Sequence, residues 1–409
     1  MIRSTKHSIK FLNDGKKERY HSFLNEYRRV SSIIGDSIWN DGYESFNVNN
    51  DILEFPKYVD YNKFKVQTWL SARCLSSIVT QISSIIRGAV DKRKRYLFIS
   101  NKLKNNNESS EHLDNKLDVM ILVKPEFSKI NPELSSKNVD IRNGKYFDYF
   151  IGLKSIGDDK ICIPIKKTRL DIKWEKRGKI LGGFLFSEDK IEFRYDVVPE
   201  ENIGSVTIGI DQGMNDILTI SDGRTTPKND IHGNTLPSIL DKMSKKKKGS
   251  KAFERAQEQR KNFINWSINQ LNFRNVQEVR FEKIYNIGYK KRKSRKLSHW
   301  TNTLIRDKVK RVCEEMKVSF IEQSSSYRSQ RCSHCGLVRK ANRKGKSYKC
   351  NNCNLEMDSD LNAAKNHLCD LPDVHWKFRG SKHNLGKGFF WNPNGLFDWN
   401  GQELRVPVS

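Results

Sequence analysis

The chain has 409 residues, enough for roughly two or three domains with cores of their own. There are 75 Lys and Arg against 48 Asp and Glu, and the formal charge of +27 favours a DNA or RNA partner over a charged surface that serves solubility alone. The N-terminus lacks an apolar signal core and no stretch approaches the roughly 18 apolar residues of a spanning helix, which argues against membrane attachment.

The first part of the chain begins with helical patterns. Residues 8–12 indicate a short strand, residues 20–38 place apolar side chains on one helical face, and residues 75–89 repeat apolar side chains at spacings of three and four. The second helix continues into a basic cluster that suits phosphate contact and a solvated helix end equally well: Lys92, Arg93, Lys94 and Arg95.

A β-rich segment follows from about residue 117 to 199, where apolar runs are separated by turn signals. A small β-barrel that includes the N-terminal strand, with the helices inserted between its strands, would satisfy this order. We therefore predict a barrel over residues 1–14 and 115–200 and a helical domain over residues 15–114.

Near residue 205 the pattern changes to strand, hairpin, long helix, strand, helix and strand. Apolar and polar residues alternate over 206–211, a hairpin turn follows at 222–223, and further strands are predicted over 276–282 and 318–321. This is the order of an α/β nuclease core of the ribonuclease H type.

Three acidic residues stand where such a core would bring them together. Asp211 ends the first strand, Glu282 closes the strand over 276–282, and Asp360 opens the last helix. A cluster of three carboxylates is repulsive without a cation, and two Mg²⁺ ions about 3.5–4 Å apart would turn it into a clamp for phosphodiester hydrolysis. One acidic residue at a strand end is usually an ordinary surface group, so the prediction depends on all three in this order.

Four of the eight cysteines form a metal-site pattern: two Cys-x-x-Cys pairs separated by fourteen residues. This spacing predicts a closed tetrahedral thiolate site, which favours structural zinc over catalysis. The ligands would be Cys332, Cys335, Cys350 and Cys353. The other cysteines are scattered beside apolar segments, as expected of a reducing compartment.

Further basic residues flank these motifs and are candidate nucleic-acid contacts: Lys245, Lys246, Lys290, Lys291, Arg292, Arg343 and Lys344. The last forty residues are rich in aromatic side chains. Stacking on bases and packing against the rest of the protein both remain open for that segment.

Taken together, these motifs resemble a known family. The segment from Ile208 to Gly213, the turn Ser221–Gly223, Phe281–Glu282, the first cysteine pair and the Asp-x-Asp-Leu-Asn-Ala-Ala run from Asp358 look like the RuvC domain of transposon-associated TnpB proteins and of the compact type V CRISPR effectors. The match covers roughly residues 205–368, and the fold it implies is a ribonuclease H-like RuvC domain with an inserted zinc ribbon.

The resemblance implies an RNA-guided DNA endonuclease with a guide RNA and double-stranded target DNA as partners, two Mg²⁺ ions at Asp211, Glu282 and Asp360, and structural Zn²⁺ in the ribbon. It implies a wedge-like barrel with an inserted helical recognition domain in the first half. A cytoplasmic, nucleoid-associated protein of a bacterial, archaeal or phage-infected cell would follow. The corresponding ranges are 201–325 and 355–370 for the RuvC domain, 326–354 for a nucleic-acid-binding ribbon and 371–409 for an aromatic tail.

The sequence departs from the family at Lys283 and Arg328, neither of which is expected to bind metal. Asp358 is interpreted either as a group that supports the metal ligands from behind or as a helix-capping group beside Asp360. Two alternatives stay open: a guided DNA binder that does not cut, and a guide-independent RuvC-type nuclease or resolvase. The origin of the guide, the flanking DNA motif, the cleavage pattern and the choice between monomer and homodimer are also open.

Overall fold

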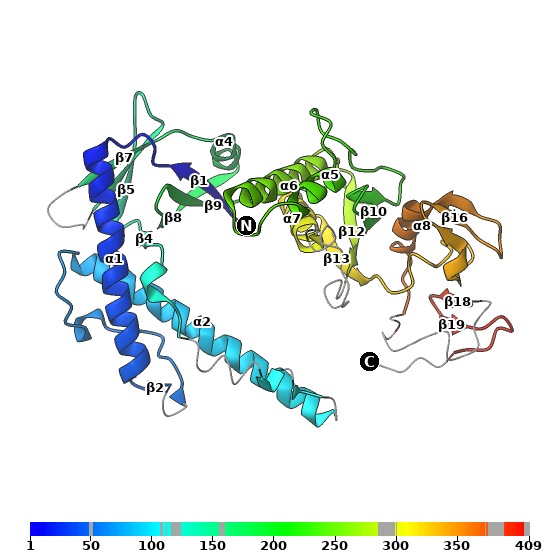
Figure 1. Cartoon of the computed structure of the whole chain (residues 1–409), viewed down its shortest axis with the longest axis horizontal. Coiled ribbons are helices and arrows are strands. Elements are labelled where there is room, and N and C mark those ends of the chain that lie inside the picture. Colours follow the sequence, from blue (N-terminus) through cyan, green and yellow to red (C-terminus); the bar gives the residue numbers. More distant parts are fainter. Residues whose placement is uncertain are drawn as a thin grey trace. The chain divides into compact units, whose positions relative to one another are not determined.

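The structure is a computed structural model in which the chain forms two compact units, Met1–Val198 and Pro199–Ser409 (Figure 1). It describes residues 1–48, 52–106, 109–111, 113–115, 124–154, 160–284, 299, 301–372, 374 and 388–404. The predicted contacts Lys290, Lys291 and Arg292 and the apolar run over 119–123 lie outside the described residues. No helix among the described residues is both long enough and apolar enough to cross a bilayer.

The two predicted helices form the α-helical part of the first unit. Helix α1 spans Asp14–Asp41 and α2 spans Ala72–Asn105, and the side chains of Asn13 and Ser71 cap their first turns by accepting backbone N–H groups. The apolar stripes are buried as their spacing predicts, including Phe23 and Tyr27 on α1 and Ile78, Ile82 and Ile86 on α2.

Apart from the short pair β2 and β3, the described strands of the first unit form two sheets rather than one. One has the order β1-β9-β8-β4 and the other the order β5-β6-β7, and both contribute to one hydrophobic core with α1 and α2. No hydrogen-bonded pairing among the described strands joins the two sheets, so the closed barrel stays a prediction. The bounds are β1 Ile2–Ser8, β4 Glu133–Ser135, β5 Val139–Asn143, β6 Tyr149–Leu153, β7 Ile161–Ile165, α4 Arg169–Glu175, β8 Gly178–Phe186 and β9 Lys190–Val197, with the short pair β2 Phe46–Asn47 and β3 Ile52–Leu53.

The second unit is built on a sheet of the order β11-β10-β12-β13. Strands β10, β12 and β13 are parallel and β11 is antiparallel to β10. Ile208 and Ile210 of β10 are buried in a core with three helices, one of which, α5, was not predicted. The bounds are β10 Val206–Gln212, β11 Leu218–Ile220, α5 Leu236–Ser244, α6 Lys251–Asn269, β12 Val276–Lys283, α7 Asn302–Glu315 and β13 Ser319–Ser324.

Helix α8 (Ser359–Asn366) packs on the opposite face of this sheet, against β10 and β11 (Figure 1). The approach is so close that a Cβ atom at Gly209 would lie 2.1 Å from the carbonyl oxygen of Ala364. Only glycine fits there, because any side chain would push the helix away from β10, the strand that carries Asp211.

The cysteine-containing segment forms short strands between β13 and α8. One small sheet has the order β15-β16-β17. A second has the order β14-β18-β19, in which β18 and β19 come from the C-terminal tail. Phe389 and Trp391 of β18 are buried, so these tail residues pack against the ribbon. The bounds are β14 Leu337–Val338, β15 Arg343–Lys344, β16 Ser347–Lys349, β17 Glu356–Asp358, β18 Phe389–Asn392 and β19 Gly395–Phe397.

Candidate active site and metal centre

The structure brings the three predicted carboxylates to one edge of the second unit's sheet. Asp211 and Glu282 lie on the neighbouring parallel strands β10 and β12, and Asp360 lies in the first turn of α8. Asp211 and Asp360 are only 8% and 7% exposed. All three line a cavity of about 390 Å³, which the ribbon's hairpin also borders through Arg343, Gly345 and Lys346.

Burial and mutual repulsion make this cluster prefer protons or cations. Burial, followed by the charges of Glu282 and Asp360, raises the pKa of Asp211 well above its ordinary value. Burial likewise raises the pKa of Glu282 to about 7, with the charge of Asp360 adding to the effect, although the backbone N–H of Gln212 donates to Glu282 Oε2 at 3.3 Å. The negative charges of these buried carboxylates are not balanced by enough positive groups of the protein. Carboxylate oxygens of this kind are the ligands that Mg²⁺ and Mn²⁺ prefer.

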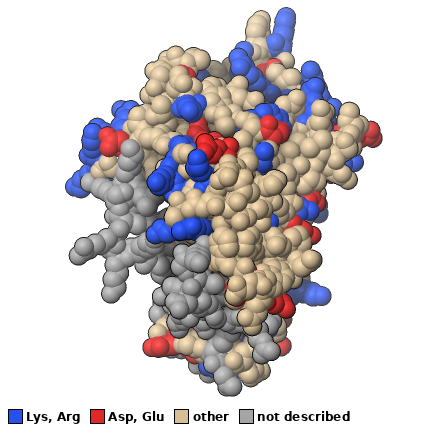
Figure 2. Space-filling view, turned by 90° about the vertical axis from the view of Figure 1, so that its right-hand side faces the viewer, with Lys and Arg blue, Asp and Glu red and all other residues tan. Residues whose placement is uncertain are grey.

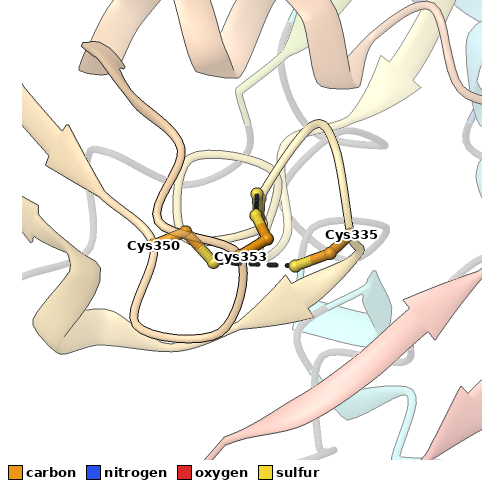
Figure 3. Close-up of side chains that lie close together, drawn as sticks. Cys335, Cys350 and Cys353 are labelled. Atoms are coloured by element: carbon orange, nitrogen blue, oxygen red, sulfur yellow. Dashed lines mark hydrogen bonds between the residues drawn. The ribbon is translucent and has the colours of Figure 1, made fainter.

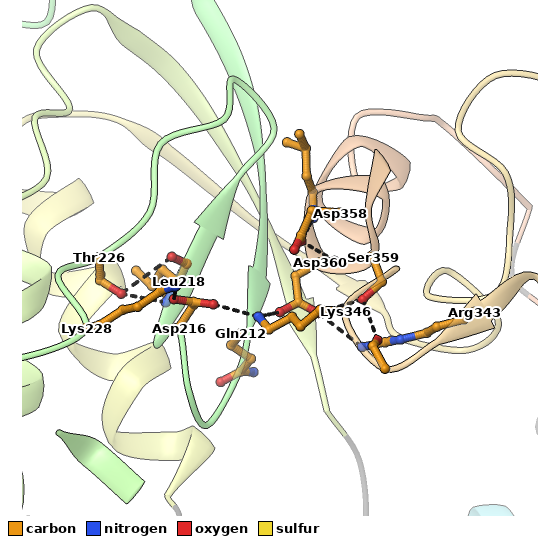
Figure 4. Close-up of polar contacts among 12 residues, drawn as sticks. Gln212, Asp216, Leu218, Thr226, Lys228, Arg343, Lys346, Asp358, Ser359 and Asp360 are labelled. Carbon is orange, nitrogen blue, oxygen red and sulfur yellow. Dashed lines mark hydrogen bonds and ion pairs between the residues drawn. The ribbon is translucent and has the colours of Figure 1, made fainter. Parts of the chain in front are cut away.

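Two cations of the ribbon hairpin face Asp360 (Figure 4). Arg343 Nη2 lies 3.0 Å from Asp360 Oδ1, and Lys346 contacts Asp360 Oδ2. Lys346 Nζ also lies 2.6 Å from Oδ2 of Asp216, a residue of the β10–β11 connection. Burial lowers the pKa of Lys346, but its hydrogen bonds to Asp216 and Asp360 outweigh this and raise it.

Only part of this arrangement could be predicted from the sequence. Arg343 and Lys344 are predicted nucleic-acid contacts, whereas in the structure Arg343 is paired with a candidate catalytic carboxylate. Asp216 was missed. Its only signal is that it follows Asp211 by five residues, between a strand and its hairpin partner.

Backbone contacts hold the hairpin in this place. The Ser359 N–H donates to the carbonyl of Lys346 at 2.8 Å, and its hydroxyl donates to the carbonyl of Gly345 at 2.9 Å. Asp358 caps α8, as expected, by accepting from the N–H groups of Asp360 and Leu361. The turn of the hairpin is therefore fixed to Ser359, the residue directly before Asp360.

Two asparagines of α8 join the helix to the first cysteine loop. The Asn362 amide donates to the carbonyl of Arg331 at 2.7 Å and accepts from the N–H of Ser333 at 3.0 Å. Asn366, which is fully buried, donates to the carbonyls of Arg328 and Arg331 and accepts from the Arg331 guanidinium at 2.5 Å. The unusual Arg328 is itself buried, and its guanidinium donates to main-chain carbonyls at the end of α8.

The four predicted cysteines come together as a group, three of which Figure 3 labels. The Cys332 and Cys353 sulfurs are 3.6 Å apart, as are those of Cys335 and Cys350. Thiolates bound to zinc at about 2.3 Å in a tetrahedron lie about 3.8 Å from one another, so the arrangement fits Zn²⁺ and is far too wide for a disulfide. His334 is exposed and is not one of the group.

His367 is a further residue of the site that was not anticipated. His367, at the end of α8, is 1% exposed, and its imidazole forms a group with the Asp211 and Glu282 carboxylates in which the ligand atoms all lie within 4.8 Å of one another. Burial lowers the pKa of His367 to about 3, with the Arg328 charge adding to the effect, so the ring is neutral at pH 7.

The other described basic residues of the prediction are not among those that line the carboxylate cavity. Lys92, Lys94 and Arg95 are exposed on α2, with Arg93 half-buried, and Lys245 follows α5 and pairs with Asp241 at 2.8 Å. Lys246 is half-buried and Lys344 is exposed on β15. On the face in Figure 2, Lys and Arg side chains surround a small group of acidic ones and extend well beyond it.

Comparison with known proteins supports this description of the second unit. Residues 304–367 match the family described as the Cas12f1-like TNB domain. Over 74 residues the chain is 39% identical to the CRISPR-associated endodeoxyribonuclease Cas12f1 of Sulfoacidibacillus thermotolerans, a match that covers 18% of each protein.

Solved structures were also matched along most of the chain. One is a cryo-EM structure of a Cas12f1–sgRNA–target DNA complex, with a TM-score of 0.48, 16% identity and coverage of 86% of this chain and 80% of that one. Another is the mini-RNA-guided endonuclease CRISPR-Cas_phi3, with a TM-score of 0.45, 9% identity and coverage of 90% and 92%. The family match and the curated relative confirm that this chain resembles the compact, TnpB-like type V CRISPR effectors.

Proposed function

We propose that the chain is an RNA-guided DNA endonuclease that hydrolyses phosphodiester bonds at a single RuvC-type site. The observation that carries the proposal is the convergence of Asp211, Glu282 and Asp360 at the ends of the parallel strands β10 and β12, within and beside a segment that matches the Cas12f1-like TNB domain. The raised pKa values of Asp211 and Glu282 support a site that works with bound cations.

Asp211, Glu282 and Asp360 would hold two Mg²⁺ ions, which supply a metal-activated water and charge stabilisation on the leaving oxygen. The protein's own part is to fix the three carboxylates at two strand ends and a helix start, and to limit the entry of water by burying Asp211 and Asp360. Arg343 and Lys346 stand at the same cavity and would neutralise a phosphate once the carboxylates are occupied by metal.

The domain assignment belongs to the same proposal. The first unit, with its helical segment over 15–114 and strands over 1–14 and 115–200, would hold the guide RNA and read a flanking DNA motif. The RuvC domain would comprise 201–325 and 355–370, with the zinc ribbon over 326–354. Base pairing by the guide would read the target sequence while the protein contacts backbone and shape. The exposed Lys92, Lys94 and Arg95 support such contacts.

The test uses the full chain purified together with the RNA that accompanies it. Asp211→Ala should lower the cleavage rate of a guide-matched duplex by on the order of 10³-fold while leaving RNA and DNA binding unchanged. Asp222→Ala, on the next hairpin turn, is the matched control and should cut normally. Cleavage retained by Asp211→Ala would refute the site, the absence of any bound RNA would refute guidance, and binding without cutting by the parent chain would favour a repressor.

A further inference from the structure

The candidate active site has a component that is not a carboxylate. His367 is seven residues after Asp360, two turns along α8, and therefore lies on the same face of the helix. Asp360 lies at the start of α8 and His367 directly follows its end, and His367 approaches the two strand carboxylates, Asp211 and Glu282, from that end. The ligand atoms of His367, Asp211 and Glu282 lie within 4.8 Å of one another.

This spacing is close to that of ligands around one metal ion. Metal–ligand bonds of about 2.1 Å place two ligands on opposite sides of an ion about 4.2 Å apart, so a movement of about half an ångström would complete the contact. Among the described residues, the groups that could hold a metal are this one and the four cysteines. Asp360 is held by Arg343 and Lys346 instead.

The imidazole is held as a metal-binding histidine usually is. His367 Nδ1 lies 3.4 Å from Oε1 of Gln323, the β13 residue that pairs with Glu282 across the sheet. A partner at one ring nitrogen orients the other as a ligand. The backbone is equally constrained, because a Cβ atom at Gly209 would lie 3.0 Å from the Cβ of His367.

We propose that His367 is a nitrogen ligand of a divalent cation that is also bound by Asp211 and Glu282, an inference that rests on the proposed function of the site. The two ends of α8 then make unlike cation positions, one beside Asp360 with oxygen ligands and one beside His367 with a nitrogen ligand. An imidazole nitrogen favours Mn²⁺ and the later transition ions over Mg²⁺. The position beside His367 therefore binds Mn²⁺ and the later transition ions in preference to Mg²⁺.

The test measures the ligand directly. The full chain, with zinc in place, is loaded with Mn²⁺, and the electron spin echo modulation of the bound ion is recorded. A ¹⁴N modulation is expected in the parent chain, and it should change to a ¹⁵N pattern when the protein is labelled with ¹⁵N-histidine. This comparison needs no variant and therefore does not depend on whether a substituted chain folds.

Variants assign the signal to one residue. His367→Gln should abolish the nitrogen modulation and weaken Mn²⁺ binding about tenfold while changing Mg²⁺ binding less. His232→Gln replaces an exposed histidine of the second unit and should change neither. Asp211→Asn should lose the ions bound at this site. Comparing the metal content of this variant with that of the parent chain therefore shows which ions bind there.

The outcomes separate the two proposals. If Mn²⁺ binding depends on Asp211 but the bound ion shows no modulation from a histidine nitrogen, the role of His367 is refuted. The carboxylate site then still stands. The absence of any Mn²⁺ or Mg²⁺ binding that depends on Asp211 would refute the metal-dependent site on which the proposed function rests.

Discussion

Lys346, at the turn of the ribbon hairpin, forms an ion pair with Asp360, the carboxylate in the first turn of α8. The same ammonium group lies 2.6 Å from Asp216 on the β10–β11 connection. One side chain thus links the ribbon, helix α8 and the β10–β11 connection. It also occupies a carboxylate that the proposed reaction needs for a metal ion.

We therefore predict that Lys346→Met tightens the binding of divalent cations. An ammonium ion and a metal ion compete for Asp360, and a half-exposed ion pair of about 1 kcal/mol corresponds to roughly a fivefold change in affinity. Isothermal titration calorimetry of the full chain with Mg²⁺ measures this change in affinity. Lys349→Met is the control, because Lys349 pairs with Glu356 on the same small sheet. An unchanged or weaker affinity in Lys346→Met would show that the ammonium does not compete.

The stability of the chain without added divalent cations should depend on pH through Glu282. Its pKa is raised from 4.5 to about 7 in the folded protein, so between these values the folded state holds a proton that the unfolded state has lost. The free energy of unfolding therefore falls as pH rises from about 4.5 to about 7, and the loss is complete above pH 7.

Glu282→Gln should weaken this dependence, leaving the part that the raised pKa of Asp211 contributes, and should stabilise the chain at pH 8 by up to about 3 kcal/mol. Denaturant unfolding at pH 5, 6, 7 and 8 measures the free energy of unfolding of both chains, with Glu278→Gln on the same strand as control. Added Mg²⁺ should restore the stability of the parent chain at pH 8. A pH profile that is the same in the parent and in Glu282→Gln would contradict the assignment.

Gly209→Ala should disturb the active site without altering any functional group. The added methyl group would meet the carbonyl of Ala364 at 2.1 Å, so α8 must move away from β10 and carry Asp360 and His367 with it. We expect a loss of about 1–3 kcal/mol in stability and weaker binding of Mn²⁺. Gly88→Ala, at an open position in helix α2, should instead stabilise by about 1 kcal/mol. Equal behaviour of the two variants would mean that α8 does not pack this closely.

Cys350→Ser should remove zinc and also disturb Asp360, because the ribbon hairpin is bound to the Asp360 side chain and to the preceding residue, Ser359. We expect zinc content near zero and weaker Mg²⁺ binding, measured by metal analysis and titration on the same sample. Cys162→Ser, in the first unit, serves as the control and should keep one zinc per chain. A Cys350→Ser chain that retains its zinc would exclude the four-cysteine site.

The amino-acid sequence by itself determined the components with a strong local signature. Two Cys-x-x-Cys pairs, three acidic residues at predicted strand and helix ends, and helices with a regular apolar stripe were all identifiable, because each depends on spacing along the chain. Helix α5 was missed although Thr235 and Ser238 form a capping box, because its apolar pattern covers only nine residues. The barrel was predicted from strand order alone, and pairing between sheets has no such signature.

Only the tertiary structure decided which groups surround the carboxylates. Lys346 is 130 residues from Asp216, and His367 is 85 residues from Glu282, so no periodic pattern could relate them. The pairing of β18 with β14 likewise places tail aromatic residues against the ribbon. The contacts of Lys346 and His367 depend on the glycine at 209, which lets α8 lie against β10 and so brings both ends of the helix to the edge where the parallel strands finish.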